Sequence, residues 1–281
     1  MTPIRYEKDA AGIVTVVFDD PTASVNTMSP AWQAAFAAVV GHIESERGSI
    51  KGVILASAKA NFFAGAELKG ILELKASDAP ECFHTVERIK ASFRALDKLG
   101  RPVVAAINGA ALGGGWEVAL AAHHRICVDD PKIQLGTPEV TLGLIPGAGG
   151  ITKTVRLLGL EAAMPYLMEG KLLGPREALK LGLVHELVTS REALDAAARE
   201  WIAANASPKQ PWDSEGYKIP GGSPSSPHIA SMLAIAPAVL VEKTRRLYPA
   251  PEAVLASAVE GPRWISIPPC ASSPGLSHVS W

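Results

Sequence analysis

Two alternating hydrophobic patterns organise the first half of the chain. Short, continuous apolar runs predict strands that are buried on both faces, at residues 12–18, 52–57 and 102–109. Stretches with helical periodicity of apolar positions predict helices, at residues 30–46, 80–99 and 114–123. Because each strand is followed by a helix, the strands are expected to lie parallel in one sheet with right-handed crossovers. The pattern therefore predicts an α/β fold.

After residue 136 the pattern changes, and helix and loop dominate. A Pro- and Gly-rich loop leads into an amphipathic helix, and helix, turn, short strand and two more helices follow, at residues 137–159, 165–188, 237–247 and 251–260. Pro, Gly and Ser crowd residues 207–227, which is typical of a linker or an extended surface segment. We predict a main domain, a linker, a helical segment and a disordered or non-native tail, at residues 1–204, 205–228, 229–261 and 262–281.

Composition places the chain among globular proteins. Its 281 residues are 48% hydrophobic, which is enough to bury a sizeable core. Lys and Arg number 27 against 28 Asp and Glu, so the net charge of -1 gives no overall field that would attract nucleic acid or anionic lipid. We therefore expect no nucleic-acid partner and no membrane insertion, and any anion site must be local.

The cysteines favour a reducing compartment. Cys82, Cys127 and Cys270 show neither a CxxC motif nor the spacing of Cys/His metal ligands, and an odd count favours free thiols. The N-terminal residues pass from charged positions directly into a strand-like run, without the apolar segment of a signal peptide. These features predict a cytoplasmic protein.

A glycine cluster, "NGAALGGGWEVALAAHH" at residues 108–124, is the first candidate for chemistry. Glycines between a strand and a helix leave backbone N–H groups uncovered, and the helix dipole adds partial positive charge there. Such a place suits an anion or a developing oxyanion. A dinucleotide loop is disfavoured because the cluster comes more than a hundred residues into the chain and no acidic residue ends a following strand. Tight strand-to-helix packing alone is the remaining alternative.

Two carboxylates favour the functional interpretation. Glu117 falls in the first turn of the predicted helix, and Glu139 follows a Gly-x-Pro turn. The adjacent His123 and His124 do not predict a metal site, because neighbouring helical residues face different directions and no partner ligand is evident. We predict no metal.

Three segments resemble the signatures of one family. "FFAGAELKGI" at 62–71, "NGAALGGGWEVALAAHHRICVDD" from residue 108 and "QLGTPEVTLGLIPGAGG" at 134–150 resemble those of the crotonase (enoyl-CoA hydratase/isomerase) superfamily, in the same order. The resemblance implies the ClpP/crotonase fold, an α/β spiral core of β-β-α units with a helical C-terminal region. Later segments resemble the N-terminal hydratase part of bacterial multifunctional fatty-acid oxidation proteins. That branch implies a 3-hydroxyacyl-CoA dehydrogenase domain in a full-length protein.

The resemblance also assigns the reacting groups. In crotonases two backbone N–H groups hold the thioester oxygen, and the matching positions here are Ala66 and Gly114. An enolate forms during the reaction, and preorganised donors stabilise its charge more than the ground-state carbonyl. Glu117 and Glu139 match the two catalytic glutamates, with Glu117 assigned to the water and Glu139 to proton exchange at the alpha carbon. Two carboxyl groups close together in an apolar pocket are expected to have different pKa values, so that one is neutral while the other is ionised.

Further positions match the family's substrate strip. Those for the acyl group and CoA are Ala23, Val25, Ala64, Gly65, Ala66, Leu68, Gly113, Gly114, Trp116, Pro138 and Gly147. Trp116 departs from the smaller residue of the family pattern and is expected to narrow the acyl pocket. Lys59 and Lys69 are candidates for the CoA phosphates. Coenzyme A enters as part of the substrate, and we predict no other cofactor.

The expected function is hydration of trans-2-enoyl-CoA to 3-hydroxyacyl-CoA in fatty-acid beta-oxidation. A Δ3,Δ2-enoyl-CoA isomerase of the same family is an alternative, and it would need only the Glu139 position. A catalytically idle acyl-CoA-binding subunit is an alternative from another class, although the intact "GGGWE" and "TPE" segments disfavour it. Crotonases commonly form trimers or hexamers, so the resemblance implies a homo-oligomer.

Overall fold

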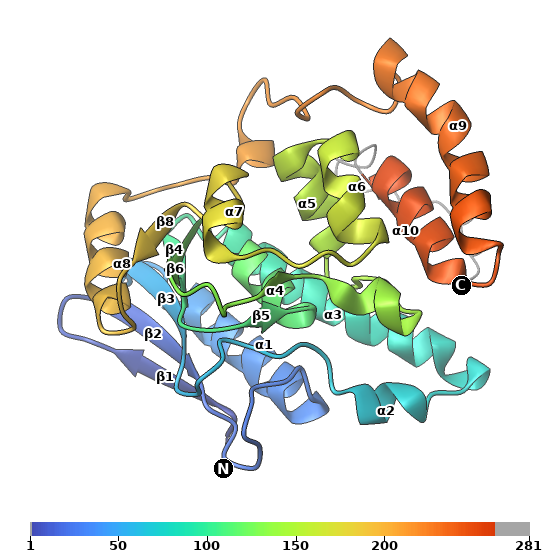
Figure 1. The fold of residues 1–281 in the computed structure, drawn as a ribbon. Helices are drawn as coiled ribbons and strands as arrows, with labels where there is room; N and C mark the ends of the chain where they lie inside the picture. Colours follow the sequence, from blue (N-terminus) through green and yellow to red (C-terminus); the bar gives the residue numbers. More distant parts are fainter. Residues whose placement is uncertain (1, 262–281) are drawn as a thin grey trace.

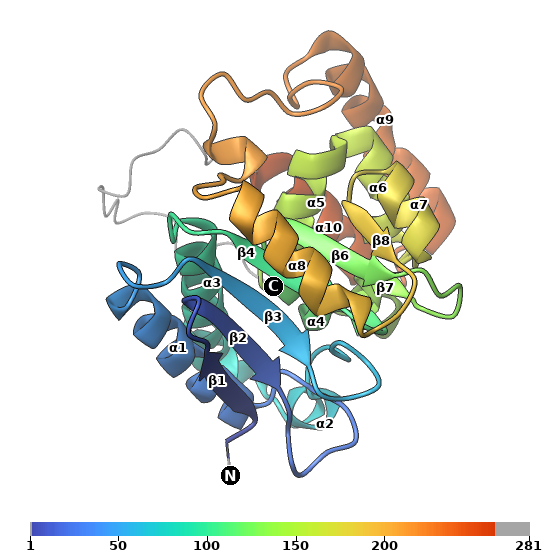
Figure 2. The ribbon, with the colours of Figure 1, turned by 90° about the vertical axis from the view of Figure 1, so that its left-hand side faces the viewer.

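The computed structural model describes residues 2–261 and is built around a six-stranded sheet. The strand order is β1-β2-β3-β4-β6-β8, and only β1 runs antiparallel to its neighbour (Figures 1 and 2). The strands are β1 Ile4–Lys8, β2 Ile13–Phe18, β3 Gly52–Ser57, β4 Val103–Ile107, β6 His124–Val128 and β8 Glu186–Val188. The parallel arrangement confirms the α/β prediction, and β1 is an addition that the sequence pattern did not indicate because only Ile4 of its five residues is buried.

Helices cover both faces of this sheet. On one face lie α1 Pro30–Ser45 and α3 Ala79–Asp97, and on the other lies α8 Ala193–Ala204, in front of the sheet in Figure 2. The start of α1 is set by Ser29, whose side chain accepts a hydrogen bond from the Trp32 N–H. Pro30 takes the first helical position, where a missing N–H costs nothing.

A second, two-stranded parallel sheet stands apart from the main one and carries the glycine cluster. It pairs β5 Ala111–Leu112 with β7 Leu135–Gly136. The helix α4 Gly114–Leu120 follows β5, and the 3-10 turn η2 Pro138–Leu142 follows β7. The two glutamate-bearing segments therefore leave adjacent strands side by side.

The predicted helix at 114–123 is three residues too long. It ends at Leu120, and His124 already belongs to β6. His123 accepts from the Val103 N–H at Nδ1, so its Nε2–H donates to the Asp97 carbonyl at 3.1 Å. His124 stacks on Trp201, with ring centroids 4.5 Å apart. Both histidines are thus structural parts of the packing between elements.

The C-terminal half is helical and has an apolar core of its own. Besides α8, its helices are α5 Gly150–Leu158, α6 Leu160–Met168, α7 Pro175–Lys180, α9 Pro227–Thr244 and α10 Pro249–Glu260, and the short α2 Leu68–Leu72 lies earlier in the chain. The helices α5, α6, α9 and α10 lie together (Figure 1), and residues of all four share one buried cluster. Within the described residues no helix combines the length and hydropathy needed to cross a bilayer.

Two local expectations in this half differ from the structure. The helix α9 begins at Pro227, ten positions before the predicted start at Pro237, which lies inside the helix. In the segment that we predicted to be extended, Gln210 and Trp212 are buried, because the 3-10 turn Pro211–Asp213 packs onto the main domain. The boundaries of the domains stay a prediction, and the expected tail at 262–281 lies outside the described residues.

Candidate active site

Each glycine of the GGG cluster meets a different close neighbour. Gly113 has a φ of +54°, and a Cβ there would lie 2.8 Å from Glu139 Oε1. A Cβ on Gly115 would lie 2.5 Å from the Phe63 carbonyl oxygen, and one on Gly114 would lie 2.8 Å from Met28 Cε. At Gly115 a side chain would collide with the Phe63 backbone, whereas at Gly113 and Gly114 it would displace the ends of the Glu139 and Met28 side chains. The cluster thus allows three segments to approach α4 closely.

The two predicted oxyanion donors are neighbours in space. The Cβ direction of Gly114 points to within 4.0 Å of the Ala66 nitrogen. Among residues 2–261 no protein acceptor takes a hydrogen bond from the N–H of Ala66 or of Gly114. Two donors that are close together and without protein acceptors suit a carbonyl oxygen that gains negative charge.

Glu117 lies in the first turn of α4 and is held by the start of α5. Its side chain is buried, and its Oε1 accepts a hydrogen bond from the Gly150 N–H at 2.7 Å. Burial raises the pKa of the Glu117 carboxyl, while the backbone of Gly150 and Ala148 and the charge of Lys153 act against that rise. Glu117 is thus a carboxyl group in an apolar place whose ionised form receives specific support.

Glu139 is the second residue of the 3-10 turn after β7 and faces Gly113. Burial and the neighbouring charge of Glu117 raise the pKa of Glu139 to about 8. Its Oε2 atom is buried and has no hydrogen-bond partner among the described residues. A proton on Glu139 removes the cost of a buried, unsupported charge, which is the physical cause of the raised pKa.

The predicted CoA strip is assembled from two loops. The Ala64 N–H donates to the Asn26 carbonyl and the Met28 N–H donates to the Gly65 carbonyl, both at 2.9 Å. Residues 26–28 and 64–66 therefore run alongside each other. The assignment of Ala23 and Val25 to the CoA strip stays a prediction. No sequence pattern indicates that Met28 lies against Gly114, because this contact joins segments 86 positions apart.

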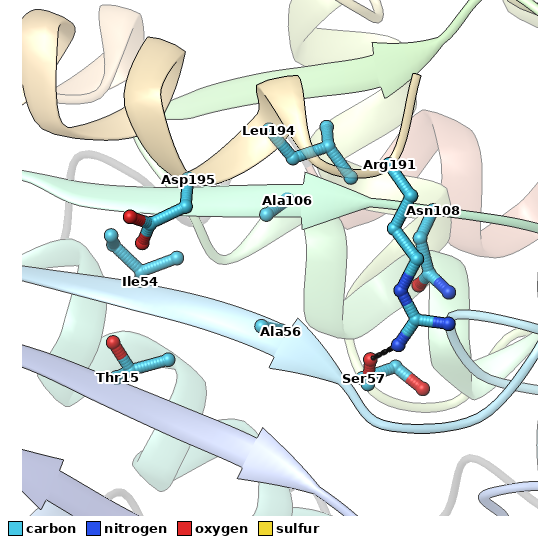
Figure 3. A pocket seen from close by; sticks show the side chains of 9 residues that line it. All are labelled: Thr15, Ile54, Ala56, Ser57, Ala106, Asn108, Arg191, Leu194 and Asp195. Atoms are coloured by element: carbon cyan, nitrogen blue, oxygen red, sulfur yellow. Dashed lines mark hydrogen bonds between the residues drawn. The ribbon is translucent and has the colours of Figure 1, made fainter.

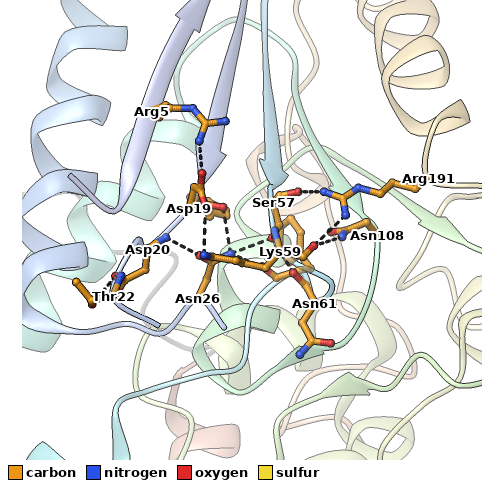
Figure 4. Close-up of polar contacts among 12 residues, drawn as sticks. Arg5, Asp19, Asp20, Thr22, Asn26, Ser57, Lys59, Asn61, Asn108 and Arg191 are labelled. Carbon is orange, nitrogen blue, oxygen red and sulfur yellow. Dashed lines mark hydrogen bonds and ion pairs between the residues drawn. The ribbon is translucent and has the colours of Figure 1, made fainter. Parts of the chain in front are cut away.

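Asn26 is a structural residue of this strip that the sequence analysis did not single out. It is buried, and its Nδ2 donates to Ser57 Oγ at 2.9 Å and to the Phe18 and Phe62 carbonyls (Figure 4). Its Oδ1 accepts from the Asp20 N–H at 3.2 Å. One side chain thus fixes the loop after β2 to the loop after β3.

The remaining predicted substrate positions are distributed around this centre. Trp116 is 2% exposed and belongs to the main core, whereas Leu68 is 46% exposed at the start of α2. Gly147 lies near Val86 of α3, and Pro138 precedes Glu139 at the start of η2. The structure thus brings together the donors, the glutamates and the CoA strip, and it leaves Leu68 at the surface.

The two lysines suggested for the CoA phosphates differ. Lys59 Nζ forms an ion pair with Asp19 Oδ1 at 3.2 Å, so a phosphate there would compete with a carboxylate of the chain (Figure 4). Lys69 is exposed on α2. Of the two, Lys69 is the better placed for a solvated phosphate.

A cavity of about 110 Å³ lies on the face of the main sheet that α8 covers (Figure 3). Its lining consists of Thr15, Ile54, Ala56, Ser57, Ala106, Asn108, Arg191, Leu194 and Asp195. Arg191 donates to the Ser57 and Lys59 carbonyls at 2.7 and 3.1 Å. Neither glutamate lines this cavity, and its polar groups brace the loop that follows β3.

Comparison with known proteins identifies the family. The sequence profile of the family described as enoyl-CoA hydratase/isomerase matches residues 8–211. The fatty acid oxidation complex subunit alpha of Shewanella loihica is 36% identical over 252 residues, which cover 89% of this chain and 35% of the relative. That of Shewanella frigidimarina is 39% identical over 187 residues, covering 66% of this chain and 26% of the relative. The chain therefore spans about a third of the length of these curated relatives.

Solved structures show the same fold. An enoyl-CoA hydratase from Bacillus anthracis superposes with a TM-score of 0.64 at 31% identity, over 72% of this chain and 76% of that one. Pseudomonas aeruginosa DspI superposes with a TM-score of 0.64 at 25% identity, over 93% of this chain and 94% of that one. The resemblance and the crotonase-type fold that the sequence indicated are both confirmed. The chain belongs to the enoyl-CoA hydratase/isomerase family.

Proposed function

We propose that this chain hydrates trans-2-enoyl-CoA to 3-hydroxyacyl-CoA. The observation that carries the proposal is the pair of glutamates, Glu117 buried and Glu139 half-buried, beside two backbone donors. Burial raises the pKa of both carboxyls; we assign the ionised role to Glu117, which accepts the Gly150 N–H, and the protonated role to Glu139, whose pKa is raised to about 8. Ala66 and Gly114 would hold the thioester oxygen.

In the proposed reaction, water adds across the conjugated double bond. Ionised Glu117 takes a proton from water as the oxygen bonds to the beta carbon, and electron density moves through the double bond onto the thioester oxygen. Protonated Glu139 then gives its proton to the alpha carbon, and the enolate returns to a thioester. The proton on Glu117 replaces the one that Glu139 has lost. Atoms and electrons balance without a redox step, so we propose no metal and no nicotinamide.

The direct test is an absorbance assay. Adding the protein to crotonyl-CoA or a longer homologue in the presence of EDTA should abolish the absorbance of the conjugated enoyl thioester. Binding of CoA esters without turnover at any chain length would favour an idle binding subunit. Loss of activity with EDTA would contradict the metal-free mechanism.

Isomerisation of 3-enoyl-CoA is the second candidate, and the pH profile separates it from hydration. Hydration requires protonated Glu139, so kcat/KM for hydration should fall about tenfold per pH unit above about pH 8. Isomerisation begins with removal of a proton from the alpha carbon, which requires ionised Glu139, so its rate should rise with pH towards about pH 8. Initial rates of both reactions from pH 6 to pH 10 check this prediction, and parallel profiles would contradict it.

The same buried proton affects stability. Because the pKa of Glu139 is raised in the folded state, its contribution to stability is fully present below the unfolded-state pKa and is lost as pH rises through about 8. The thermal midpoint should therefore decline between the unfolded-state pKa and about pH 8 and level off above that pH. In Glu139→Gln, which has no charge to bury, this part of the decline should disappear from a melting series over the same pH range.

We also propose the setting of this activity from the relatives' names. Because they are alpha subunits of a fatty acid oxidation complex and the chain spans about a third of their length, we propose that a dehydrogenase domain accompanies it in a full-length protein. We further propose beta-oxidation as the pathway, the cytoplasm as the location and a homo-oligomer as the assembly. Light scattering tests the assembly, and a monomer at micromolar concentration would contradict it.

A further inference from the structure

A buried lysine lies one turn along α5 from Gly150, the residue whose N–H bonds Glu117. Lys153, on α5, is almost completely buried, and its Nζ donates to Asp97 Oδ1 at 3.1 Å and to the Leu120 carbonyl at 3.2 Å. Asp97 closes α3 and Leu120 closes α4. One ammonium group therefore joins three helices.

Gln210 completes this cluster from the C-terminal half. Its Nε2 donates to Asp97 Oδ1 at 3.0 Å and to the Ala122 carbonyl at 3.2 Å. A buried ion pair of this kind contributes little net stability, because desolvation of the two charges offsets their attraction. The main effect of the cluster is therefore to fix the positions of α3, α4 and α5 relative to one another.

The spacing of the contacts links the cluster to the glutamate. Glu117 and Leu120 are three positions apart on α4, and Gly150 and Lys153 are three positions apart on α5. Residues at this spacing share a helix face. The two helices therefore contact each other at two points one turn apart. The Gly150 N–H donates to Glu117 Oε1 at 2.7 Å, and Lys153 Nζ donates to the Leu120 carbonyl at 3.2 Å.

We propose that Lys153, anchored by Asp97 and Gln210, is a positioning residue for the hydration reaction. It holds the Gly150 N–H on Glu117 and so keeps the Glu117 carboxyl aimed at the water. Lys153 itself does not touch the substrate. This inference rests on the proposed function of Glu117.

Three charged groups act on Glu117 from the elements around it. Lys153 on α5 and Lys90 on α3 lower the pKa of Glu117, and Glu139 of η2 is the neighbouring carboxyl. Burial is the larger effect and raises that pKa. Removing the Lys153 charge should therefore raise the pKa of Glu117 further and move the acid limb of hydration to higher pH.

The experiment compares Lys153→Met, Lys153→Arg and a matched control, Lys171→Met, whose lysine forms an exposed ion pair with Glu177. Lys153→Met should lower kcat for hydration roughly tenfold or more. A catalytic group displaced by about 1 Å can lose about 100-fold in rate, so a smaller displacement of Glu117 accounts for this loss. Isomerisation, which depends on Glu139, should stay within about twofold, and KM should change little. Lys153→Arg should restore part of the hydration, and Lys171→Met should behave like the parent.

The proposal would be overturned if Lys153→Met lost hydration and isomerisation equally while the acid limb of its hydration pH profile stayed unchanged. That result would indicate a structural role alone. If Lys153→Met does not fold, the double variant Asp97→Asn/Lys153→Met removes both buried charges and is tested in the same way. A parent protein without hydratase activity would contradict the proposed function instead. In that case the Glu117 carboxyl is titrated by carbon NMR, and an unchanged pKa in the Lys153 variant overturns the positioning role.

Discussion

Glu117→Gln is expected to lower the hydration rate by about 100- to 10,000-fold, the usual range for loss of a general acid or base. The amide oxygen of Gln can still accept the Gly150 N–H that holds Glu117 at 2.7 Å, so the side chain should keep its place. What disappears is the ability to take a proton from water. Stopped-flow or steady-state assays with crotonyl-CoA measure the loss in hydration rate.

The same variant carries a second, independent signature. The charge of Glu117 is one of the causes that raise the pKa of Glu139, so its removal should lower that pKa from about 8. Isomerisation should survive, and its rise with pH should move to lower pH. Glu169→Gln, an exposed glutamate paired with Lys243, is the control and should change neither reaction. Hydration near the parental rate in Glu117→Gln would refute the two-carboxylate mechanism.

Glu139→Gln is expected to suppress hydration and isomerisation together, each by about 100-fold or more. Both reactions move a proton at the alpha carbon, and a Gln side chain neither donates nor accepts it. Because Glu139 Oε2 is buried without a partner in the described part of the chain, an uncharged replacement should not disturb the fold. Rates with 2-enoyl and 3-enoyl substrates give the two losses.

Binding separates this loss from a loss of the site. The substrate is expected to be held by the backbone groups of Ala66 and Gly114 and by the CoA strip, none of which changes in Glu139→Gln. Calorimetric titration with a saturated acyl-CoA should therefore give nearly the parental Kd. A Kd weakened in step with the rate would mean that Glu139 shapes the pocket, and the assigned proton transfer would be wrong.

The sequence by itself determined the order of β2, α1, β3, α3, β4 and α4 and nominated Glu117 and Glu139, but it did not indicate β1, β5 or β6. Apolar runs such as 52–57 and 102–109 record burial on both faces of a parallel sheet, and this pattern is local to each segment. The glycine cluster and the turn before Glu139 are local as well, because both depend on backbone conformation within a few positions. Short-range physics of this kind can be recognised in a single sequence.

Only the tertiary structure decided what supports the glutamates. Gly150 lies 33 positions from Glu117, Lys153 lies 56 positions from Asp97, and Gln210 lies 113 positions from Asp97. No periodicity or motif encodes such pairs, because each depends on where α5 packs against the ends of α3 and α4. The pKa of a buried carboxyl depends on its surroundings from all directions. The sequence could therefore nominate Glu117 and Glu139, and only the packing of distant segments could give each carboxyl its own surroundings.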